Sequence, residues 1–269
     1  MASETVFECR GVHYAYRGRF PALGGVDIAV EAGERVALVG ANGCGKSTLL
    51  SLLDALVFAD KGRVLFRGVA LTEAAFSDDA FARSFRKQVG LVFQNPDVQL
   101  FCPTVRDDIA FGPLQLGVDA KTAEARIGRL AEALGIGALL DRSPHQLSVG
   151  EKRKVALATS LAVEPDVLLL DEPTAGLDPR TTTHLIELLD AFARAGKTVV
   201  TATHDLHIVP DLADRVYVFG QNRTIAGSGT PEQVLADHAL LDANNLIHVH
   251  HHHASDHRKF RWSAPDDKR

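Results

Sequence analysis

The chain has 269 residues, of which 46% are hydrophobic and 23% charged, so it is long enough to form a full core in one large domain or two smaller ones. Its net charge of −5 argues against nucleic acid as its main partner. The three cysteines, Cys9, Cys44 and Cys102, are scattered and odd in number, which excludes a disulfide framework and is typical of a reducing cytosol.

We expect neither a signal peptide nor a membrane span. Residues 1–5 carry no basic region and no apolar core of the kind that a signal peptide has. No run approaches the roughly 18–20 apolar residues that cross a bilayer. If the protein works at a membrane, a partner must therefore provide the membrane part.

The first predicted element is a small antiparallel sheet within residues 5–31. Val26, Ile28 and Val30 share one face of a strand, and the residues between them form the other face. Tyr16 lies on this sheet and could stack on a purine ring. Packing is the usual role of a tyrosine on a strand, so the residues alone leave both roles open.

A glycine-rich loop with the pattern G-x-x-x-x-G-K-S lies between an apolar run, 34–39, and a predicted helix, 46–57. This order is typical of a phosphate-binding loop, in which backbone N–H groups and the positive end of the helix surround an anion. An ordinary turn has no structural need for Lys46 and Ser47. We expect Lys46 to reach the β- and γ-phosphates and Ser47 to bind Mg²⁺. The predicted phosphate-binding residues are Gly40, Asn42, Gly43, Cys44, Gly45, Lys46, Ser47 and Thr48.

Cys44 lies inside this loop, close in sequence to Lys46 and to the helix N-terminus. Both features lower the pKa of a thiol. The sequence therefore predicts a reactive Cys44, whose modification inhibits nucleotide hydrolysis and which bound nucleotide protects.

The middle of the chain changes from mixed to helical patterning. Ala, Leu, Arg and Glu dominate residues 104–163, with helical spacing in 122–134 and 148–161. We expect a helical subdomain, at about residues 97–163, inserted into an α/β core. The core elements predicted before it are short strands at 63–66 and 89–93 and a helix at 78–87.

The helix predicted at 148–161 begins with a capping box, because Glu151 follows Ser148 by three residues. A stable helix start is one sufficient reason for this pattern. An exposed helix N-terminus with Ser148 and Gly150 is also suited to binding an anion. The residues alone do not decide between these two interpretations.

Residues 167–170 are consecutively apolar, which predicts a strand covered on both faces, as in a parallel sheet. Asp171 and Glu172 follow directly. Because neighbouring side chains on a strand point to opposite sides, we expect one carboxylate to serve Mg²⁺ and the other to polarise a water molecule. Solvation of a strand end is the alternative, and the phosphate loop upstream favours the functional interpretation.

Asp178 and Pro179 predict the start of a helix that ends near Gly196. The buried strand that follows, 197–203, leads to His204. A packed, hydrogen-bonded histidine is the ordinary interpretation, but ligands bind at the carboxyl edge of such sheets, so we expect His204 near phosphate. The last predicted elements are strands at 216–219 and 224–226 and a capped helix from Thr230.

The tail is rich in histidine and is a flexible ligand set for cations such as Ni²⁺, Co²⁺ or Zn²⁺. A purification tag is the alternative, but Val249 interrupts the run and the chain continues to Arg269. A tail without a role is a third possibility. The candidate metal ligands are His248, His250, His251, His252, His253 and His257.

With these motifs in this order, residues 4–235 strongly resemble the ATP-binding subunit of an ABC transporter. The resemblance implies an α/β fold: a P-loop NTPase core with a mostly parallel sheet, an N-terminal antiparallel β subdomain and an inserted α-helical subdomain. The ATPase domain would span residues 1–235, and residues 236–269 would form a short helical extension and the histidine-rich tail.

The resemblance also implies a role for each motif. Residues 40–48 match Walker A, and residues 167–172 match Walker B, with Asp171 toward Mg²⁺ and Glu172 as the catalytic base. Gln94 matches the Q-loop glutamine, a further ligand toward Mg²⁺ that couples the nucleotide site to a membrane partner. The remaining matches are Tyr16 as the adenine-stacking aromatic, Asp178 as the D-loop aspartate and His204 as the catalytic switch histidine.

Residues 147–151 resemble the family signature, usually Leu-Ser-Gly-Gly-Gln. Ser148 and Gly150 are like the residues that contact the γ-phosphate across a dimer, whereas Val149 and Glu151 depart from the pattern. Glu151 keeps the capping box but adds negative charge near a phosphate site. The resemblance implies two ATP molecules between two ATPase subunits, which we expect to form a homodimer.

Within the family, residues 90–101 look like those of energy-coupling-factor (ECF) importers. The resemblance implies an ATPase, with ATP and Mg²⁺ as cofactors, at the cytoplasmic face of the membrane. Its partners would be a transmembrane scaffold, contacting residues 94–101 and 104–111, and a substrate-binding membrane subunit. The tail favours Co²⁺ or Ni²⁺ as cargo. A vitamin such as biotin is the alternative, and a soluble ABC ATPase without transport is the third hypothesis.

Overall fold

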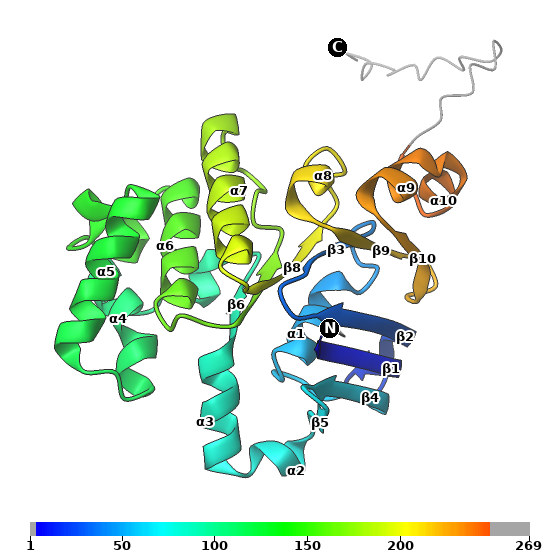
Figure 1. The fold of residues 1–269 in the computed structure, drawn as a ribbon, viewed down its shortest axis with the longest axis horizontal. Helices are drawn as coiled ribbons and strands as arrows, with labels where there is room; N and C mark the ends of the chain where they lie inside the picture. The colour runs from blue at the N-terminus through cyan, green and yellow to red at the C-terminus, as the bar shows by residue number, and fades with distance from the viewer. Residues whose placement is uncertain (1–3, 248–269) are drawn as a thin grey trace, which may run out of the picture.

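The computed structural model describes residues 4–247 and builds them around two sheets. The smaller sheet is antiparallel and has the strand order β2-β1-β4-β5. It forms one side of the molecule (Figure 1). Its strands are β1 (Thr5–Tyr16), β2 (Phe20–Glu31), β4 (Lys61–Phe66) and β5 (Val69–Ala70).

The larger sheet has the order β10-β9-β3-β8-β7-β6, and only β10 runs antiparallel to its neighbour. The carboxyl ends of three strands meet at one edge, because Val39 pairs with Thr203 and Asp171 pairs with Ala202. The strands are β3 (Arg35–Val39), β6 (Val89–Val92), β7 (Val167–Asp171), β8 (Thr198–Thr203), β9 (Arg215–Phe219) and β10 (Ile225–Gly229).

Side chains on the two faces of strand β7 pack into two different parts of the hydrophobic core. Leu169 packs with helix α1 and the antiparallel sheet, while Leu168 and Leu170 pack with the helices on the other face. The prediction of a strand covered on both faces is therefore confirmed. The expected fold class, a mostly parallel sheet beside an antiparallel one, is also confirmed.

The helices of the middle of the chain lie together (Figure 1). Those between β6 and β7, α4, α5 and α6, gather at one side of the molecule, and α7 stands next to them. Their bounds are α4 (Val105–Gln115), α5 (Ala120–Leu134), α6 (Val149–Leu161) and α7 (Pro179–Arg194), with 3₁₀ turns at Pro96–Val98, Gly137–Leu139 and Pro144–Gln146. The remaining helices are α1 (Lys46–Leu53), α2 (Glu73–Phe76), α3 (Asp79–Gln88), α8 (Val209–Leu212), α9 (Pro231–Ala236) and α10 (His238–Ala243).

None of the helices described for residues 4–247 has both the length and the apolar character needed to cross a membrane.

Helix α1 ends at Leu53, four residues before the predicted end at 57. Ala55 adopts a left-handed φ of 52°, which stops the helix. The guanidinium of Arg86, on α3, donates to the carbonyl of Asp54 at 2.6 Å and to its Oδ2 at 3.3 Å. The end of the helix thus depends on a residue 32 positions away, which local sequence signals do not report.

Burial raises the pKa of the Asp54 carboxyl from 3.8 to about 7, although Arg86 opposes the shift. A carboxyl whose pKa is raised in the folded state favours the protonated form. Its contribution to stability is therefore present at low pH and is lost as the pH rises through about 7.

We expect Asp54→Asn to remove this dependence. The free energy of unfolding of the variant, relative to the wild type, should rise by roughly 1–3 kcal/mol between about pH 5 and about pH 8, because the amide that replaces the carboxyl does not ionise. Urea denaturation across that range measures the difference. Asp79→Asn, which changes an exposed carboxyl on α3, is the control. A difference that stays constant with pH would contradict the assignment.

Candidate functional site

The glycine-rich loop joins β3 to α1 at the carboxyl edge of the larger sheet. Gly43 and Gly45 adopt left-handed φ values of 80° and 115°, which suit glycine. A Cβ on Gly45 would also lie only 2.6 Å from the carbonyl oxygen of Ala22. The sequence pattern therefore reflects a tight backbone path, and this path turns the loop around the start of α1.

Lys46 lies at the first position of α1 and is only 5% exposed. Its Nζ donates to the carbonyls of Gly40 at 2.6 Å and Ala41 at 3.4 Å. The same Nζ lies 3.7 Å from Oε1 of Glu172. A buried ammonium is thus held at the centre of the loop, beside a carboxylate.

A cleft of about 400 Å³ runs from the antiparallel sheet across the loop to the end of β7. It brings together Tyr16, Gln94 and Glu172, which are far apart in the sequence. The hydroxyl of Tyr16 is 3.2 Å from Oγ1 of Thr48, so the ring is tied to the loop while 44% of the residue stays exposed. The lining residues are Tyr16, Phe20, Pro21, Ala22, Asn42, Gly43, Gly45, Lys46, Ser47, Thr48, Gln94, Glu172 and Arg223.

Phe20 and Arg223 were not predicted as site residues. Phe20 begins β2 and pairs with Tyr16 across the β1–β2 hairpin, whereas Arg223 lies in the turn between β9 and β10 and reaches the cleft from the larger sheet. Their local sequence carries no motif that could have identified them.

The sequence predicts that Asp171 and Glu172, at the end of β7, face opposite sides of a strand, and this prediction is wrong. The strand ends at Asp171, and Glu172 adopts a left-handed φ of 48°. Alternation along a strand therefore does not separate the two side chains. Asp171 and Glu172 both interact with the charge of Lys46 instead.

The Glu172 carboxylate is buried among groups from three segments. Oε2 accepts a hydrogen bond from Oγ1 of Thr203 at 3.4 Å, and Oε1 lies near Lys46. Nδ1 of His204 lies 2.9 Å from Oε1, but the ring is not oriented for a hydrogen bond, and Oε1 has no hydrogen-bond partner within the described part of the chain. The buried carboxylate therefore keeps an oxygen available to a ligand.

The residues near Asp171 fit a nucleotide-bound Mg²⁺. Burial raises the pKa of the Asp171 carboxyl, Ser47 and Lys46 oppose this rise, and Glu172 adds to it. Oδ1 of Asp171 is buried and has no hydrogen-bond partner among residues 4–247. Those residues also contain no group of three His, Cys, Asp or Glu side chains that could hold a metal. The carboxylate of Asp171 and the hydroxyl of Ser47 suit Mg²⁺, which completes its coordination shell with phosphate and water oxygens.

The start of α6 is the expected capping box. Oγ of Ser148 accepts from the Glu151 amide at 3.3 Å, and Oε2 of Glu151 accepts from the Ser148 amide at 2.7 Å. The hydrogen bond from the Ser148 amide is the largest of the effects that lower the pKa of the Glu151 carboxyl. Ser148 is exposed, and Val149 is 59% exposed.

Ser148, Gly150, Glu151 and Asp178 do not line the cleft. Asp178 instead caps α7 by accepting from the Thr181 amide, as its position before Pro179 predicts. One chain therefore brings together the loop, Tyr16, Gln94, Glu172 and His204, while the start of α6 does not line the cleft. The predicted metal ligands of the tail, from His248 to His257, lie outside the described residues.

The predicted lowering of the Cys44 pKa is wrong. The residue is 6% exposed, and burial raises the pKa of the thiol, although Lys46 opposes the shift. The side chain packs in the same core cluster as α1, and its Sγ lies only 2.6 Å from the position that a Cβ on Gly40 would take. The sequence shows that Lys46 is near, but not that the thiol points inward.

Comparison with known proteins places these features in a family. The family model described as "ABC transporter" matches residues 23–175. The chain is 50% identical to the nickel import ATP-binding protein NikO of Rhodobacter capsulatus, over 90% of this chain and 95% of NikO. It is 42% identical to the energy-coupling factor transporter ATP-binding protein EcfA of Methanothermobacter thermautotrophicus, over 90% of this chain and 76% of EcfA.

Among solved structures, cbiO1 from Clostridium perfringens, described as part of the ABC transporter complex cbiONQ, superposes with a TM-score of 0.75. The two sequences are 34% identical, and the match covers 90% of this chain and 95% of cbiO1.

The burial of Cys44 leads to a prediction that replaces the one made from sequence. We expect a maleimide to label Cys44 in the folded protein at least about tenfold more slowly than in guanidinium, because the thiolate is disfavoured and covered. Peptide mass spectrometry measures the labelled fraction, and Cys44→Ser identifies the signal. Rapid labelling that bound ATP prevents would instead support the original prediction.

Proposed function

The chain belongs to the ABC transporter family of ATP-binding proteins, and we propose that it hydrolyses ATP to drive import through an ECF-type membrane scaffold. The observation that carries the proposal is the cleft that joins the glycine loop and Lys46 to Gln94 and Glu172. A phosphate bound over Lys46 would have a buried carboxylate beside it, which is the arrangement that hydrolysis of a phosphoanhydride requires.

In this proposal the loop amides and Lys46 hold the β- and γ-phosphates. Lys46 exchanges its bond to the Gly40 carbonyl for a phosphate oxygen. Tyr16, tied to Thr48, provides an exposed ring at the other end of the cleft for the adenine. The cleft thus has a polar end for phosphate and an aromatic end for the base.

Glu172 accepts the proton of the water that attacks the γ-phosphate, since its Oε1 is buried and has no hydrogen-bond partner among the described residues. His204 lies beside the same oxygen and contacts the γ-phosphate as the ligand enters. Ser47, Asp171 and Gln94 would hold Mg²⁺, which when bound supplies positive charge to the phosphate oxygens. Catalysis in such a site depends mainly on positioning and charge.

A second ATPase subunit, a copy of this chain in the simplest case, completes the site. Ser148 and Gly150 lie at the N-terminus of α6, whose N–H groups would bind the γ-phosphate of a facing subunit once Glu151 releases the Ser148 N–H. Glu151 and Asp178 would lie at the same interface. Hydrolysis then removes the anion that bridges the two subunits, and the dimer opens.

An apolar surface on the helical side supports contact with a membrane scaffold. The exposed apolar side chains here are Val98 (62%), Phe101 (65%), Phe111 (43%) and Leu114 (47%). The rings of Phe101 and Phe111 meet edge to face at 5.0 Å. This surface lies within and beside residues 94–101 and 104–111, the expected scaffold contact. The chain would then be peripheral at the cytoplasmic face.

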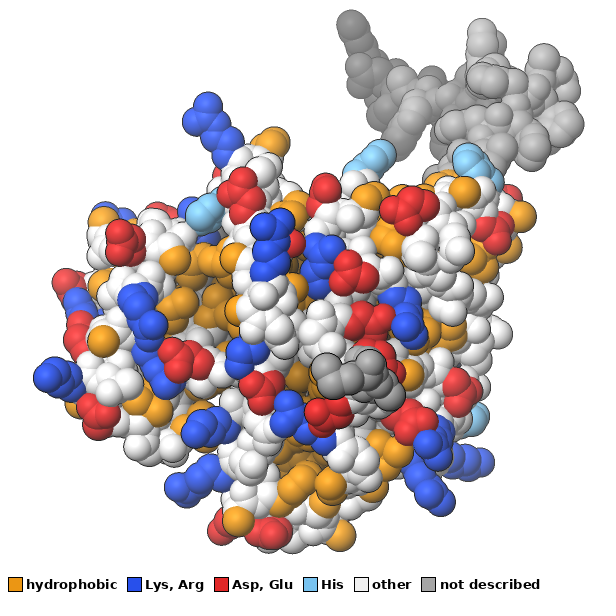
Figure 2. All heavy atoms as spheres, viewed as in Figure 1, with side chains coloured by type: hydrophobic (Ala, Val, Ile, Leu, Met, Phe, Trp, Pro, Cys, Tyr) orange, Lys and Arg blue, Asp and Glu red, His pale blue; other side chains and the backbone are white. Residues whose placement is uncertain are grey.

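Co²⁺ or Ni²⁺ is the proposed cargo. The 50% identity to a nickel import ATP-binding protein supports it, whereas EcfA is similar to the chain without a cargo in its name. A role with nucleic acid has less support, because charges of both signs are interspersed over the face seen in Figure 2. We also propose the division into an ATPase domain, 1–235, with helical residues 97–163, and an extension, 236–269.

We expect Glu172→Gln to reduce ATP hydrolysis by about 10²–10⁴-fold, because the amide cannot take the proton. ATP affinity should stay within about twofold, and an ATP-bound dimer should accumulate. Turnover assays and gel filtration with ATP measure both effects. The control is Glu187→Gln, which changes an exposed glutamate of α7. Wild-type turnover in Glu172→Gln would overturn the role of Glu172.

The cargo is tested with the complete transporter complex in vesicles. We expect ATP-dependent uptake of Co²⁺ or Ni²⁺, and no uptake when the complex carries Glu172→Gln. A panel of vitamins, biotin included, is measured in parallel. Uptake of a vitamin in place of the metal would keep the ATPase assignment and overturn the cargo, while ATP hydrolysis without any membrane partner or uptake would favour a non-transport ATPase.

A further inference from the structure

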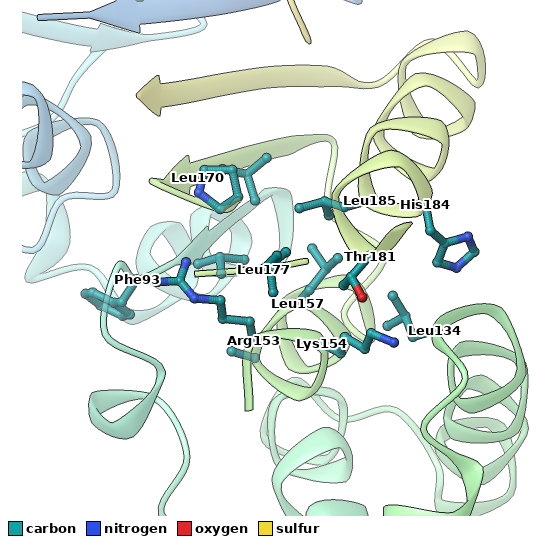
Figure 3. Close-up of a pocket in the computed structure, with 13 residues that line it drawn as sticks. Phe93, Leu134, Arg153, Lys154, Leu157, Leu170, Leu177, Thr181, His184 and Leu185 are labelled. Carbon is teal, nitrogen blue, oxygen red and sulfur yellow. The ribbon is translucent and has the colours of Figure 1, made fainter. Parts of the chain in front are cut away.

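Arg153 connects helix α6 to the backbone of Glu172. It lies on the helix whose N-terminus carries Ser148, and its Nη1 donates to the Glu172 carbonyl at 2.6 Å. Figure 3 shows the side chain leaving α6 and extending toward Phe93, which follows β6. None of the sequence motifs includes this contact.

The carbonyl that Arg153 holds belongs to a residue with an unusual backbone. Glu172 has a φ of 48°, and a non-glycine residue in the left-handed region costs on the order of 1 kcal/mol. Its amide donates to the carbonyl of Ala202 on β8 at 2.9 Å. The strained peptide is therefore fixed by β8 on its amide side and by α6 on its carbonyl side.

The side chain of Glu172 makes no hydrogen bond with Arg153. Its oxygens face Lys46, Thr203 and His204 instead. The charges of Arg153 and Glu172 attract each other, but the hydrogen bond of Arg153 goes to the backbone that presents the carboxylate and not to the carboxylate itself.

Packing alone does not hold the guanidinium in place. Arg153 lines a cavity of about 30 Å³ between α6, α7 and β7, together with Phe93, Lys154 and Leu177 (Figure 3). Its Nε is buried without a hydrogen-bond partner among residues 4–247, and burial lowers the pKa of the guanidinium. Burying an incompletely paired cation is unfavourable for stability, so stability alone does not explain an arginine at position 153.

We propose that Arg153 is a positioning residue, which couples the placement of α6 to the orientation of Glu172. The N-terminus of α6 is the part offered to the facing subunit, and Arg153 lies five residues beyond Ser148 in the same helix. When a facing subunit binds that N-terminus, any shift of α6 is transmitted through Arg153 to the carbonyl of Glu172 in the same chain. This inference rests on the proposed function of Glu172.

Arg153→Met tests the proposal in the full chain within the complete complex, since Met keeps much of the length and removes the donor. We expect kcat for ATP hydrolysis to fall about tenfold while KM stays within about twofold. Arg153→Lys, which keeps one donor, should restore part of kcat. The control is Lys154→Met, which lines the same cavity and makes no hydrogen bond to Glu172. An unchanged kcat in Arg153→Met, or a lysine variant no better than methionine, would overturn the proposal.

A double variant separates this role from general destabilisation. If Arg153 acts through Glu172, adding Arg153→Met to Glu172→Gln should leave the residual single-turnover rate within about twofold. A further tenfold loss would show that Arg153 acts elsewhere and would overturn the inference. Wild-type turnover in Glu172→Gln alone would instead remove the proposed base, a result that Arg153 variants do not produce.

Discussion

The site depends on a close approach between two buried charges, the Lys46 ammonium and the Glu172 carboxylate, which lie 3.7 Å apart. Each side chain is only 5% exposed, so neither is well solvated. The backbone carbonyls of Gly40 and Ala41 accept hydrogen bonds from the Lys46 ammonium, while Oε1 of Glu172 has no hydrogen-bond partner within residues 4–247. The arrangement is incomplete by itself, and a phosphate oxygen near Lys46 together with a water molecule near Glu172 would complete it.

Two strand ends bring these charges together. Lys46 starts a helix after β3, and Glu172 follows β7, but β8 lies between these strands in the sheet. A regular extension of β7 would carry Glu172 away from the loop on one face. The left-handed turn at Glu172 redirects the side chain, with its amide held by Ala202. Backbone strain at this position therefore supports function, because it points the carboxylate at the loop.

The sequence predicted the parts that depend on short-range rules. The run 167–170, the cap at Ser148 and the helix start at Asp178 all follow from neighbours within a few residues. The parts it did not predict depend on distant partners. The peptide of Glu172 is held by β8 and α6, and the pKa of Cys44 is raised because its side chain packs into the core.

The start of α6 has a consequence for any closed dimer. In this structure Oγ of Ser148 donates to Oε2 of Glu151 at 2.8 Å, and that same oxygen also accepts from the Ser148 amide. The hydroxyl proton and one N–H group are therefore already used by a carboxylate. A γ-phosphate arriving from a facing subunit would have to replace that carboxylate, because two anions cannot share these donors without repulsion. Closure must then move Glu151 away from the helix end. A glutamine, the usual residue of the family signature, would bring no such charge. In the proposed dimer, Glu151 would therefore oppose closure, while in the single subunit it caps the helix.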